Sequence, residues 1–296
     1  MEYVKLNNGV EMPILGFGVY QIPKEETKRC VLDAIKVGYR SIDTAQSYFN
    51  EAEVGDAIVE CGVPREELFI TTKVWIDNYD YEKCKESVME SLKKIKTDYI
   101  DLVLLHQPFS DYYGAYRALE DLYEEGKIKA IGVSNFYPDR LSDICLFERK
   151  VVPAVNQVET NPINAQFKAQ ENMEKYGVHI EAWAPFGEGR NGLFENETLV
   201  NIGKKYDKSS AQVILRWLIQ RGVIIACKST HIERMEQNFN VFDFELSNED
   251  MENINKLDAG DSLFFNHQDP TMVEWFDNIV KTRRTNEDCR KDNKNW

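Results

Sequence analysis

Short apolar or β-branched segments alternate with amphipathic stretches of helical periodicity along most of the chain. This alternation predicts repeated βα units around a parallel sheet. We predict eight strands, over residues 16–19, 40–43, 69–73, 99–105, 128–134, 154–159, 179–182 and 224–227. Glycines stand just past five of the helical stretches, where helix C-caps favour them: Gly38, Gly62, Gly126, Gly177 and Gly222.

The helical patterns cover residues 25–37, 53–61, 81–95, 113–125, 138–147, 165–176, 210–221 and 231–238. Eight strands with eight helices predict an α/β fold, the TIM (β/α)8 barrel. Two apolar runs around Asn8-Gly9 predict an N-terminal β-hairpin that caps the barrel. A helical pattern over 248–257 and an aromatic stretch follow the eighth unit, so we expect an extra C-terminal helix and loop. The whole chain, 1–296, is predicted to form a single barrel domain.

The 296-residue chain is acidic, with a formal net charge of -14 at pH 7. This charge argues against nucleic acid and anionic membrane surfaces as partners. Residues 281–296 carry six basic and three acidic side chains, and we expect a flexible charged tail there. Any anion that the protein binds must therefore meet a locally basic pocket.

The six cysteines are scattered without a CxxC or CxxH pair, which favours reduced thiols over a disulfide framework or a zinc site. No secretory signal follows Met1, and the apolar runs are short and interrupted by charge. We predict a cytoplasmic protein with no membrane span and no metal site. Asn196-Glu197-Thr198 matches a glycosylation sequon, which we interpret as a chance match.

Four side chains suited to proton transfer follow the carboxyl ends of predicted strands. Asp43 ends the second strand, Tyr48 lies in the loop after it, Lys73 ends the third strand and His106 follows the fourth. The active site of a TIM barrel lies at this end of its strands, so the four residues should meet at one face. Singly, each could be a helix cap, a solvated lysine or a core histidine. Together they indicate acid–base catalysis.

Reduction of a carbonyl group by hydride needs a proton for the developing alkoxide. A free tyrosine, with a pKa of about 10, is a poor acid near neutral pH. We expect the Lys73 ammonium to lower the pKa of Tyr48, and Asp43 to keep the buried Lys73 charged. His106 could hydrogen-bond the same carbonyl oxygen and share its charge.

Four longer segments resemble the successive signatures of the aldo-keto reductases. They are GYRSIDTAQSYFNE at 38–51, LKKIKTDYIDLVLLHQP at 92–108, GKIKAIGVSNF at 126–136 and CKSTHIERMEQN at 227–238. The resemblance runs from about Val4 to Phe265. Within the family, the chain is similar to the microbial branch that includes diketogluconate, glyoxal and methylglyoxal reductases and prostaglandin F synthase-like enzymes. It implies an NADP-dependent oxidoreductase that reduces small aldehydes and ketones to alcohols with NADPH, as a monomer or weak homodimer.

No GxGxxG motif precedes a helix, so a nicotinamide cofactor must bind the barrel itself. The resemblance implies that Trp183 stacks on the nicotinamide, in place of the family's usual tyrosine. It also implies that Ser134, Asn135 and Gln157 hold the carboxamide, and that Gly18 and Val19 line the cofactor site. The loop with Gly187, Gly189 and Gly192 either closes over the pyrophosphate or is a flexible surface loop.

The segment after the eighth strand resembles the family's pocket for the adenosine and its 2′-phosphate, with residues Lys228, Ser229, Arg234, Gln237 and Asn238. A guanidinium fork and an ammonium suit a phosphate dianion, and a helix start adds backbone amides. NADPH is therefore favoured over NADH. Arg234 could instead merely cover a helix face. Cys227 and His231 depart from the family's usual proline and threonine.

Four residues of this chain occupy positions that resemble the family's substrate pocket: Tyr20, Trp75, His106 and Phe109. By the same resemblance, the aromatic tail near Phe264 and Phe265 would help to select the substrate. Two other functions remain open. A lysine at the end of a barrel strand can be a nucleophile, so Lys73 could serve a Schiff-base aldolase, although the phosphate-pocket motif disfavours this. A non-catalytic NADPH-binding barrel is also possible, because a fold alone does not establish function.

Overall fold

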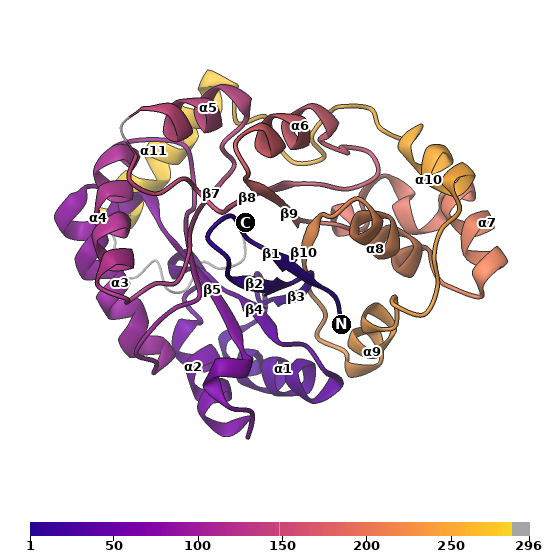
Figure 1. The fold of residues 1–296 in the computed structure, drawn as a ribbon, viewed down its shortest axis with the longest axis horizontal. Coiled ribbons are helices and arrows are strands. Elements are labelled where there is room, and N and C mark those ends of the chain that lie inside the picture. The colour runs from indigo at the N-terminus through magenta and orange to yellow at the C-terminus, as the bar shows by residue number, and fades with distance from the viewer. Residues whose placement is uncertain (148, 286–296) are drawn as a thin grey trace.

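The computed structural model describes residues 1–147 and 149–285. Its centre is a closed barrel of eight parallel strands, with helices packed around it (Figure 1). The strands follow one another around the barrel in chain order, and the last closes on the first: β3 (Leu15–Gly18), β4 (Ser41–Asp43), β5 (Phe69–Val74), β6 (Leu102–Leu105), β7 (Ile131–Ser134), β8 (Val155–Glu159), β9 (His179–Trp183) and β10 (Ile224–Cys227). The TIM barrel predicted from the sequence is confirmed.

Two strands are shorter than predicted. β6 and β7 begin three residues after residues 99 and 128, where the apolar runs start, and only an isolated bridge joins Ile100 to Ile128. Between that bridge and β6, Asp101 accepts hydrogen bonds from Arg65 (2.7 Å) and from the Ile70 backbone (2.9 Å). A buried carboxylate that needs these partners interrupts the regular strand.

The helices are α1 (Lys24–Val37), α2 (Glu51–Glu60), α3 (Tyr81–Ile95), α4 (Tyr112–Glu124), α5 (Pro138–Leu146), α6 (Phe167–Lys175), α7 (Glu197–Tyr206), α8 (Ser210–Gln220), α9 (Ile232–Phe239), α10 (Asn248–Asn255) and α11 (Pro270–Thr285). Local capping fixes several starts. Asp80 accepts a hydrogen bond from Lys83 N at the start of α3, and Ser209 and Gln212 form a capping box at α8. The five predicted C-cap glycines all have positive φ, which glycine adopts without strain.

Helix α7 was not predicted. It follows the irregular 3-10 segment η4 (Gly187–Glu195), in which Gly187, Gly189 and Gly192 have positive φ. The Asn196 side chain starts α7 by accepting hydrogen bonds from the backbone of Thr198 (3.0 Å) and Leu199 (3.4 Å). The asparagine of the apparent sequon is therefore a helix N-cap.

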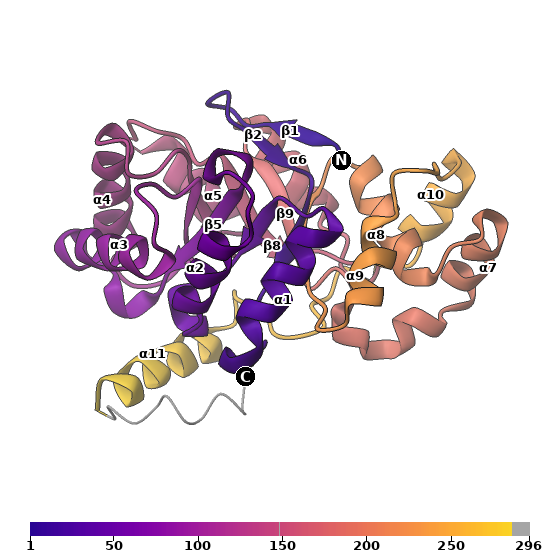
Figure 2. The same ribbon diagram turned by 90° about the horizontal axis from the view of Figure 1, so that it is seen from below.

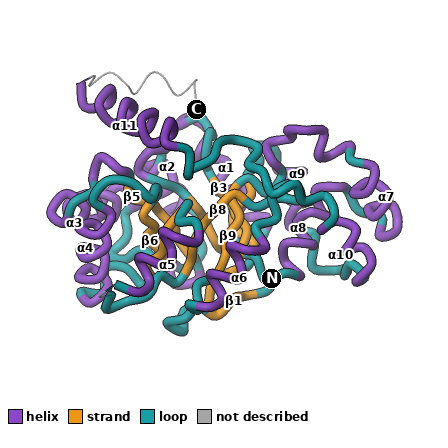
Figure 3. Tube along the Cα trace, turned by 90° about the horizontal axis from the view of Figure 1, so that it is seen from above, coloured by secondary structure: helices purple, strands orange, loops and turns teal. Residues whose placement is uncertain are grey.

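The predicted N-terminal hairpin closes one end of the barrel. β1 (Tyr3–Lys5) pairs with β2 (Glu11–Pro13), and Gly9 in the turn has a φ of 88°. Leu6 and Met12 are buried against the first residues of several barrel strands. Figures 2 and 3 show the hairpin and α11 at opposite ends of the molecule. The catalytic face predicted at the carboxyl ends of the strands is thus the α11 end.

Helix α11 corrects the boundary of the expected tail. Residues 281–285, predicted to be flexible, continue α11, and the rest of that segment, 286–296, lies outside the described residues. Phe276 and Val280 on α11 are buried, at 3% and 7% exposed. An apolar stripe of helical spacing packs against the barrel mouth, and this burial stabilises the helix.

No helix in the described part of the chain is long and apolar enough to cross a membrane. Cys30, Cys61, Cys84, Cys145 and Cys227 are free thiols. Over residues 1–147 and 149–285, no three His, Cys, Asp or Glu side chains are grouped so that they could hold a metal ion.

Gly55 marks the closest approach of two helices and gives a test of the packing. A Cβ at this position would collide with the carbonyl oxygen of Lys94 and lie 2.8 Å from Ile95 Cα, so α2 would have to move away from α3. We expect Gly55→Ala to lower the free energy of unfolding by about 1–3 kcal/mol despite the better helix propensity of alanine. Val59→Ala, at a 64% exposed position of the same helix, should change it by less than about 0.5 kcal/mol. Urea denaturation of both variants checks this, and equal midpoints would contradict it.

Candidate active site

The centre of the site is an ion pair inside the barrel. Asp43 ends β4, Lys73 lies on the neighbouring strand β5, and Lys73 Nζ stands 2.6 Å from Asp43 Oδ1. The Lys73 side chain is 1% exposed and that of Asp43 is 7% exposed. Lys73 Nζ also donates to the Thr44 carbonyl (3.1 Å) and to the Tyr48 hydroxyl (3.2 Å). All three ammonium hydrogens therefore have an acceptor.

Local structure aims the Tyr48 hydroxyl at Lys73. Tyr48 ends the 3-10 turn η1 (Gln46–Tyr48), and Phe49 leaves this turn in the left-handed region at a φ of 58°. The Gln46 side chain accepts hydrogen bonds from the backbone of Trp75 (3.0 Å) and from Asn78 Nδ2 (2.9 Å), in the turn η3 (Ile76–Asn78). The two loops are thereby held together, and the phenol is held over the end of β5.

The pKa of Tyr48 is higher than the sequence predicts. Burial raises the pKa of Tyr48 to about 12, and this effect exceeds the lowering by the Lys73 charge and its hydrogen bond. Burial would likewise lower the pKa of Lys73, but the negative charge of Asp43 and the hydrogen bond to it raise the pKa above its ordinary value. The predicted direction of the Lys73 effect is right, but the predicted net lowering for Tyr48 is wrong, because desolvation penalises the phenolate.

His106 completes the set of four at the mouth of the barrel. It follows β6, where its backbone N–H donates to the Val74 carbonyl (3.1 Å). Its ring centroid lies 5.7 Å from that of Tyr48 and 5.2 Å from that of Trp75, and its Nδ1 is 3.4 Å from Ser47 Oγ. The structure thus brings Asp43, Tyr48, Lys73 and His106 into one contiguous group.

Two amide side chains from the next strands join this group. Gln157 Nε2 donates to the second oxygen of Asp43 (3.0 Å), and Ser134 Oγ donates to the backbone carbonyl of Gln157 (2.9 Å). Trp183 Nε1 donates to Asn135 Oδ1 (2.9 Å). Because an indole N–H can only donate, it fixes which way the Asn135 amide faces, and Nδ2 donates to the His106 carbonyl (3.1 Å). These hydrogen bonds therefore fix which way the side-chain amides of Gln157 and Asn135 face.

Gly18 and Val19 lie beside Asp43. Gly18 pairs with Asp43 in the register of β3 and β4, and the Val19 backbone N–H donates to the Asp43 carbonyl (3.0 Å). Val19 is fully buried. These residues support the position of Asp43.

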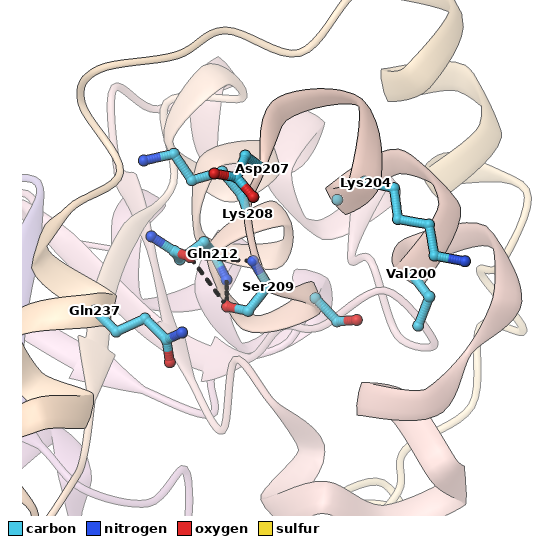
Figure 4. A pocket seen from close by; sticks show the side chains of 9 residues that line it. Val200, Lys204, Asp207, Lys208, Ser209, Gln212 and Gln237 are labelled. Carbon is cyan, nitrogen blue, oxygen red and sulfur yellow. Dashed lines mark hydrogen bonds between the residues drawn. The ribbon is translucent and has the colours of Figure 1, made fainter.

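The residues predicted to bind the adenosine and phosphate lie in the loop after β10 and on α9. Ser229 Oγ accepts from His231 N (3.1 Å) and thereby shapes the start of α9, and Asn238 is buried in that helix. Lys228, Arg234 and Gln237 are exposed. Gln237 lines a cavity of about 390 Å³ whose other walls come from α7 and α8 (Figure 4), with Lys204, Asp207, Lys208, Ser209 and Gln212 among them. The strand before this loop, β10, pairs with β9, which ends at Trp183.

Aromatic side chains surround Asp43, Tyr48, Lys73 and His106, which are called the tetrad from here on. The Tyr20 ring lies 4.9 Å from that of Tyr48, and Phe109 lies 5.3 Å from Phe276 of α11, which also contacts Trp75 at 6.1 Å. The structure therefore places Tyr20, Trp75 and Phe109 at one mouth, and it adds Phe276 to them.

The C-terminal segment covers one side of this mouth through contacts that the sequence did not indicate. His267 Nε2 is 3.0 Å from Gln107 Oε1, and burial lowers the pKa of His267 to about 3. Glu159 accepts hydrogen bonds from Ser262 and from the Leu263 backbone (2.9 Å). Phe264 packs edge-on against Trp183 at 5.1 Å.

One further charged side chain lies in the barrel interior. Glu181 on β9 is 2% exposed, and burial, together with the charge of Asp43, raises its pKa to about 8. Its Oε2 is buried without a hydrogen-bond partner among the described residues. A signal was available in the sequence, since a glutamate two residues before Trp183 in an otherwise apolar strand points to the same face as Trp183.

The chain matches the aldo/keto reductase family over residues 14–259. A glyoxal reductase from Bacillus subtilis (strain 168) is 48% identical over 262 residues, which cover 88% of this chain and 94% of the relative. A 9,11-endoperoxide prostaglandin H2 reductase from Trypanosoma cruzi (strain CL Brener) is 45% identical over 86% of this chain and 90% of the relative. The methylglyoxal reductase DkgA of Escherichia coli (strain K12) is 40% identical over 88% and 94%. These relatives are the branch that the sequence motifs predicted.

Solved structures give the same result. An aldo-keto reductase from a Medee basin deep-sea metagenome library superposes with a TM-score of 0.87 at 44% identity and covers 90% of this chain and 98% of its own. An aldo-keto reductase from Bombyx mori in complex with NADP superposes with a TM-score of 0.85 at 34% identity, over 92% and 96%. Both the fold and the sequence motifs have thus been matched over most of the chain, and the chain belongs to the aldo/keto reductase family.

Proposed function

We propose that Tyr48 donates the proton to the carbonyl oxygen of an aldehyde or ketone, in a reduction for which bound NADPH supplies the hydride. The observation that carries this proposal is the hydrogen-bonded chain from Tyr48 through Lys73 to Asp43, with contacts of 3.2 and 2.6 Å, at the mouth of the barrel. A phenol in contact with a buried ammonium is suited to lose its proton only when a strong base appears beside it.

The side chains at the mouth fit a nicotinamide carboxamide. A primary amide has donor hydrogens and an acceptor oxygen, and Ser134, Asn135 and Gln157 offer both kinds of group within one short arc of the barrel. Trp183 provides a flat wall next to them, fixed by its bond to Asn135. We therefore assign these four residues, with Gly18 and Val19 behind them, to the nicotinamide end of the cofactor.

The four tetrad residues then have separate roles. The high pKa of Tyr48 keeps its hydroxyl protonated at neutral pH, so the acid is always present. As negative charge builds up on the carbonyl oxygen, that oxygen becomes the stronger base and takes the proton. Lys73 stabilises the resulting phenolate, and Asp43 keeps Lys73 charged. His106 contacts Tyr48 and orients the carbonyl oxygen through a hydrogen bond.

Lys228, Ser229, Arg234, Gln237 and Asn238 are proposed to hold the adenosine and its 2′-phosphate. Two exposed cationic groups, Lys228 before α9 and Arg234 in its first turn, support this role in a protein of net charge -14. The same pair supports NADPH over NADH.

The substrates are proposed to be small aldehydes and ketones, with reactive dicarbonyl compounds as the first to test. The relatives named glyoxal reductase and methylglyoxal reductase support this class. An aromatic mouth of Tyr20, Trp75 and Phe109 would take up a small planar carbonyl compound. We further propose a cytoplasmic enzyme that works as a monomer or weak homodimer, in line with the scattered cysteines of the sequence.

The aldolase alternative is disfavoured by the state of Lys73. A Schiff base requires an unprotonated amine, whereas this ammonium has a raised pKa and is held by Asp43. A non-catalytic barrel is disfavoured because all four tetrad side chains are present and in contact.

Tyr48→Phe tests the proton donor. Removal of the hydroxyl should lower kcat/KM for NADPH-dependent reduction of methylglyoxal by about 100-fold or more, the range for loss of a general acid. NADPH binding, followed by fluorescence, should stay within about twofold of the original. Tyr123→Phe, at a half-buried position of α4, is the matched control and should keep its activity. Turnover by Tyr48→Phe equal to that of the control would refute the assignment.

Lys73→Met tests the ion pair through stability. It leaves the Asp43 carboxylate buried without its cation, so the free energy of unfolding at neutral pH should fall by about 3–5 kcal/mol. The double variant Lys73→Met/Asp43→Asn removes both charges and should recover part of the loss. Guanidinium unfolding curves at neutral pH decide, and a single variant as stable as the original protein would exclude the buried pair.

Arg234→Ala tests the phosphate pocket. Loss of a charge-assisted hydrogen bond of about 1.5–3 kcal/mol should raise KM for NADPH by about tenfold or more. KM for NADH, which lacks the 2′-phosphate, should change by less than about threefold. Lys168→Ala, an exposed cation on α6, is the control for net charge. Equal effects on both cofactors would show that Arg234 does not read the phosphate.

A further inference from the structure

Glu181 lies in the barrel beside the Asp43–Lys73 pair. Its strand, β9, pairs with β8, where Gln157 stands opposite Glu181 in register, and with β10, where the partner is Ile224. Gln157 hydrogen-bonds Asp43 Oδ2 at 3.0 Å and also reaches the Glu181 carboxyl. A single amide therefore connects the two acidic groups inside a water-poor core.

The charges in this core do not balance if both acids ionise. Lys73 supplies one positive charge, and Asp43 takes it through a 2.6 Å ion pair. Among the described residues Glu181 forms no ion pair, and one of its oxygens is buried without a partner. A second buried carboxylate without a cation would be strongly disfavoured. Glu181 is thus the acid that keeps its proton, and its pKa is raised to about 8, by burial first and by Asp43 second.

The strands around Glu181 contribute few other charged groups. Asp43 comes from β4 and Lys73 from β5, and the charges of both act on Glu181. β8 faces it with the neutral Gln157, while the Glu159 carboxylate of the same strand is engaged by the C-terminal segment. β10 pairs with it through the apolar residues Ile224 and Ile225. The next ionisable group along the chain of contacts is Tyr48, which Lys73 joins to the cluster.

We propose that Glu181 is a positioning residue for the reduction: it stays protonated beside the Lys73–Asp43 pair at neutral pH, and in alkaline solution its carboxylate holds the proton on Tyr48. This inference rests on the proposed role of Tyr48 as proton donor. Ionised Glu181 adds a negative charge to the cluster, and the charge opposes formation of the phenolate. The proton that Glu181 releases goes to solvent, and no covalent step is involved.

The sign of the effect follows from this coupling. A proton donor works below its own pKa, so reduction fails as Tyr48 deprotonates. Ionised Glu181 raises the pKa of Tyr48 and extends reduction to higher pH. Oxidation of the alcohol requires the phenolate as base, and the same charge delays its onset. Glutamine at position 181 keeps the neutral form at every pH.

Glu181→Gln therefore has a specific expected result. The alkaline limb of kcat/KM for methylglyoxal reduction should move to lower pH by up to about one unit, because the charge of Glu181 acts on Lys73, which contacts Tyr48. Alcohol oxidation with NADP+ should begin up to about one unit lower as well. At pH 6 to 7, where Glu181 is already neutral, kcat should stay within about twofold.

Two further variants separate charge from shape. Glu181→Met also removes the titrating proton but offers no amide, and it should shift both pH profiles in the same direction. Glu120→Gln replaces another buried glutamate, 3% exposed on α4, and should leave the profiles unchanged. Profiles that do not move in Glu181→Gln, or that move in Glu181→Gln alone, would overturn the proposal.

An infrared measurement distinguishes failure of this inference from failure of the proposed function. The difference spectrum between the original protein and Glu181→Gln at pH 6 should contain the carbonyl stretch of a protonated carboxylic acid, and the band should vanish as the pH rises to about 10. This readout needs no turnover. A missing band overturns the role of Glu181 even if Tyr48 is the proton donor. A band that titrates, in a protein whose Tyr48→Phe variant remains fully active, would support the buried proton and refute the proposed function.

Discussion

A lysine buried in a barrel core stays charged only if an anion shares its burial, and the ion pair between Lys73 and Asp43 is the constraint on which the site depends. Both oxygens of Asp43 are used, Oδ1 by Lys73 and Oδ2 by Gln157, so one carboxylate ties together β4, β5 and β8. Lys73 in turn fixes the Tyr48 hydroxyl. The residues that would carry the proton are therefore positioned by the same contacts that allow the charges to be buried.

The barrel could be predicted because parallel strands that are buried on both faces read as continuous apolar runs. The strand and helix ends were less predictable. β6 starts late because Asp101 turns its side chain toward Arg65 and the Ile70 backbone, a tertiary contact that no local pattern contains. Helix α7 was overlooked because it follows a glycine-rich turn, and its start depends on Asn196, which the sequence presents as a sequon. The aromatic tail does contain a cap, because Asp269 before Pro270 accepts a hydrogen bond from Thr271 N (2.9 Å), and α11 is further stabilised by burial of Phe276 at the barrel mouth.

The site shows the same division between local and tertiary information. Polar residues at strand ends could be found from the sequence, since the topology brings all eight carboxyl ends to one face. Desolvation could not be found in this way. Lys73 does lower the pKa of Tyr48, as its charge requires, but full burial of the phenol outweighs it. Glu181 was overlooked for a related reason: its importance depends on the distance to Asp43 across the barrel, not on its neighbours in sequence.

One wall of the barrel mouth comes from outside the part of the chain that matches the family. The family match ends at residue 259, and the tetrad and the proposed cofactor residues all precede that point. The segment beyond it contacts the mouth at several places: Ser262 and Leu263 bind Glu159, His267 binds Gln107 next to His106, and Phe276 packs on Trp75 and Phe109. These contacts bury the wall of the mouth without touching the Asp43–Lys73 pair. The C-terminal segment can therefore differ among relatives while Asp43, Tyr48, Lys73 and His106 keep their geometry, because the barrel strands and the Gln46 contacts between η1 and η3 hold these four residues in place.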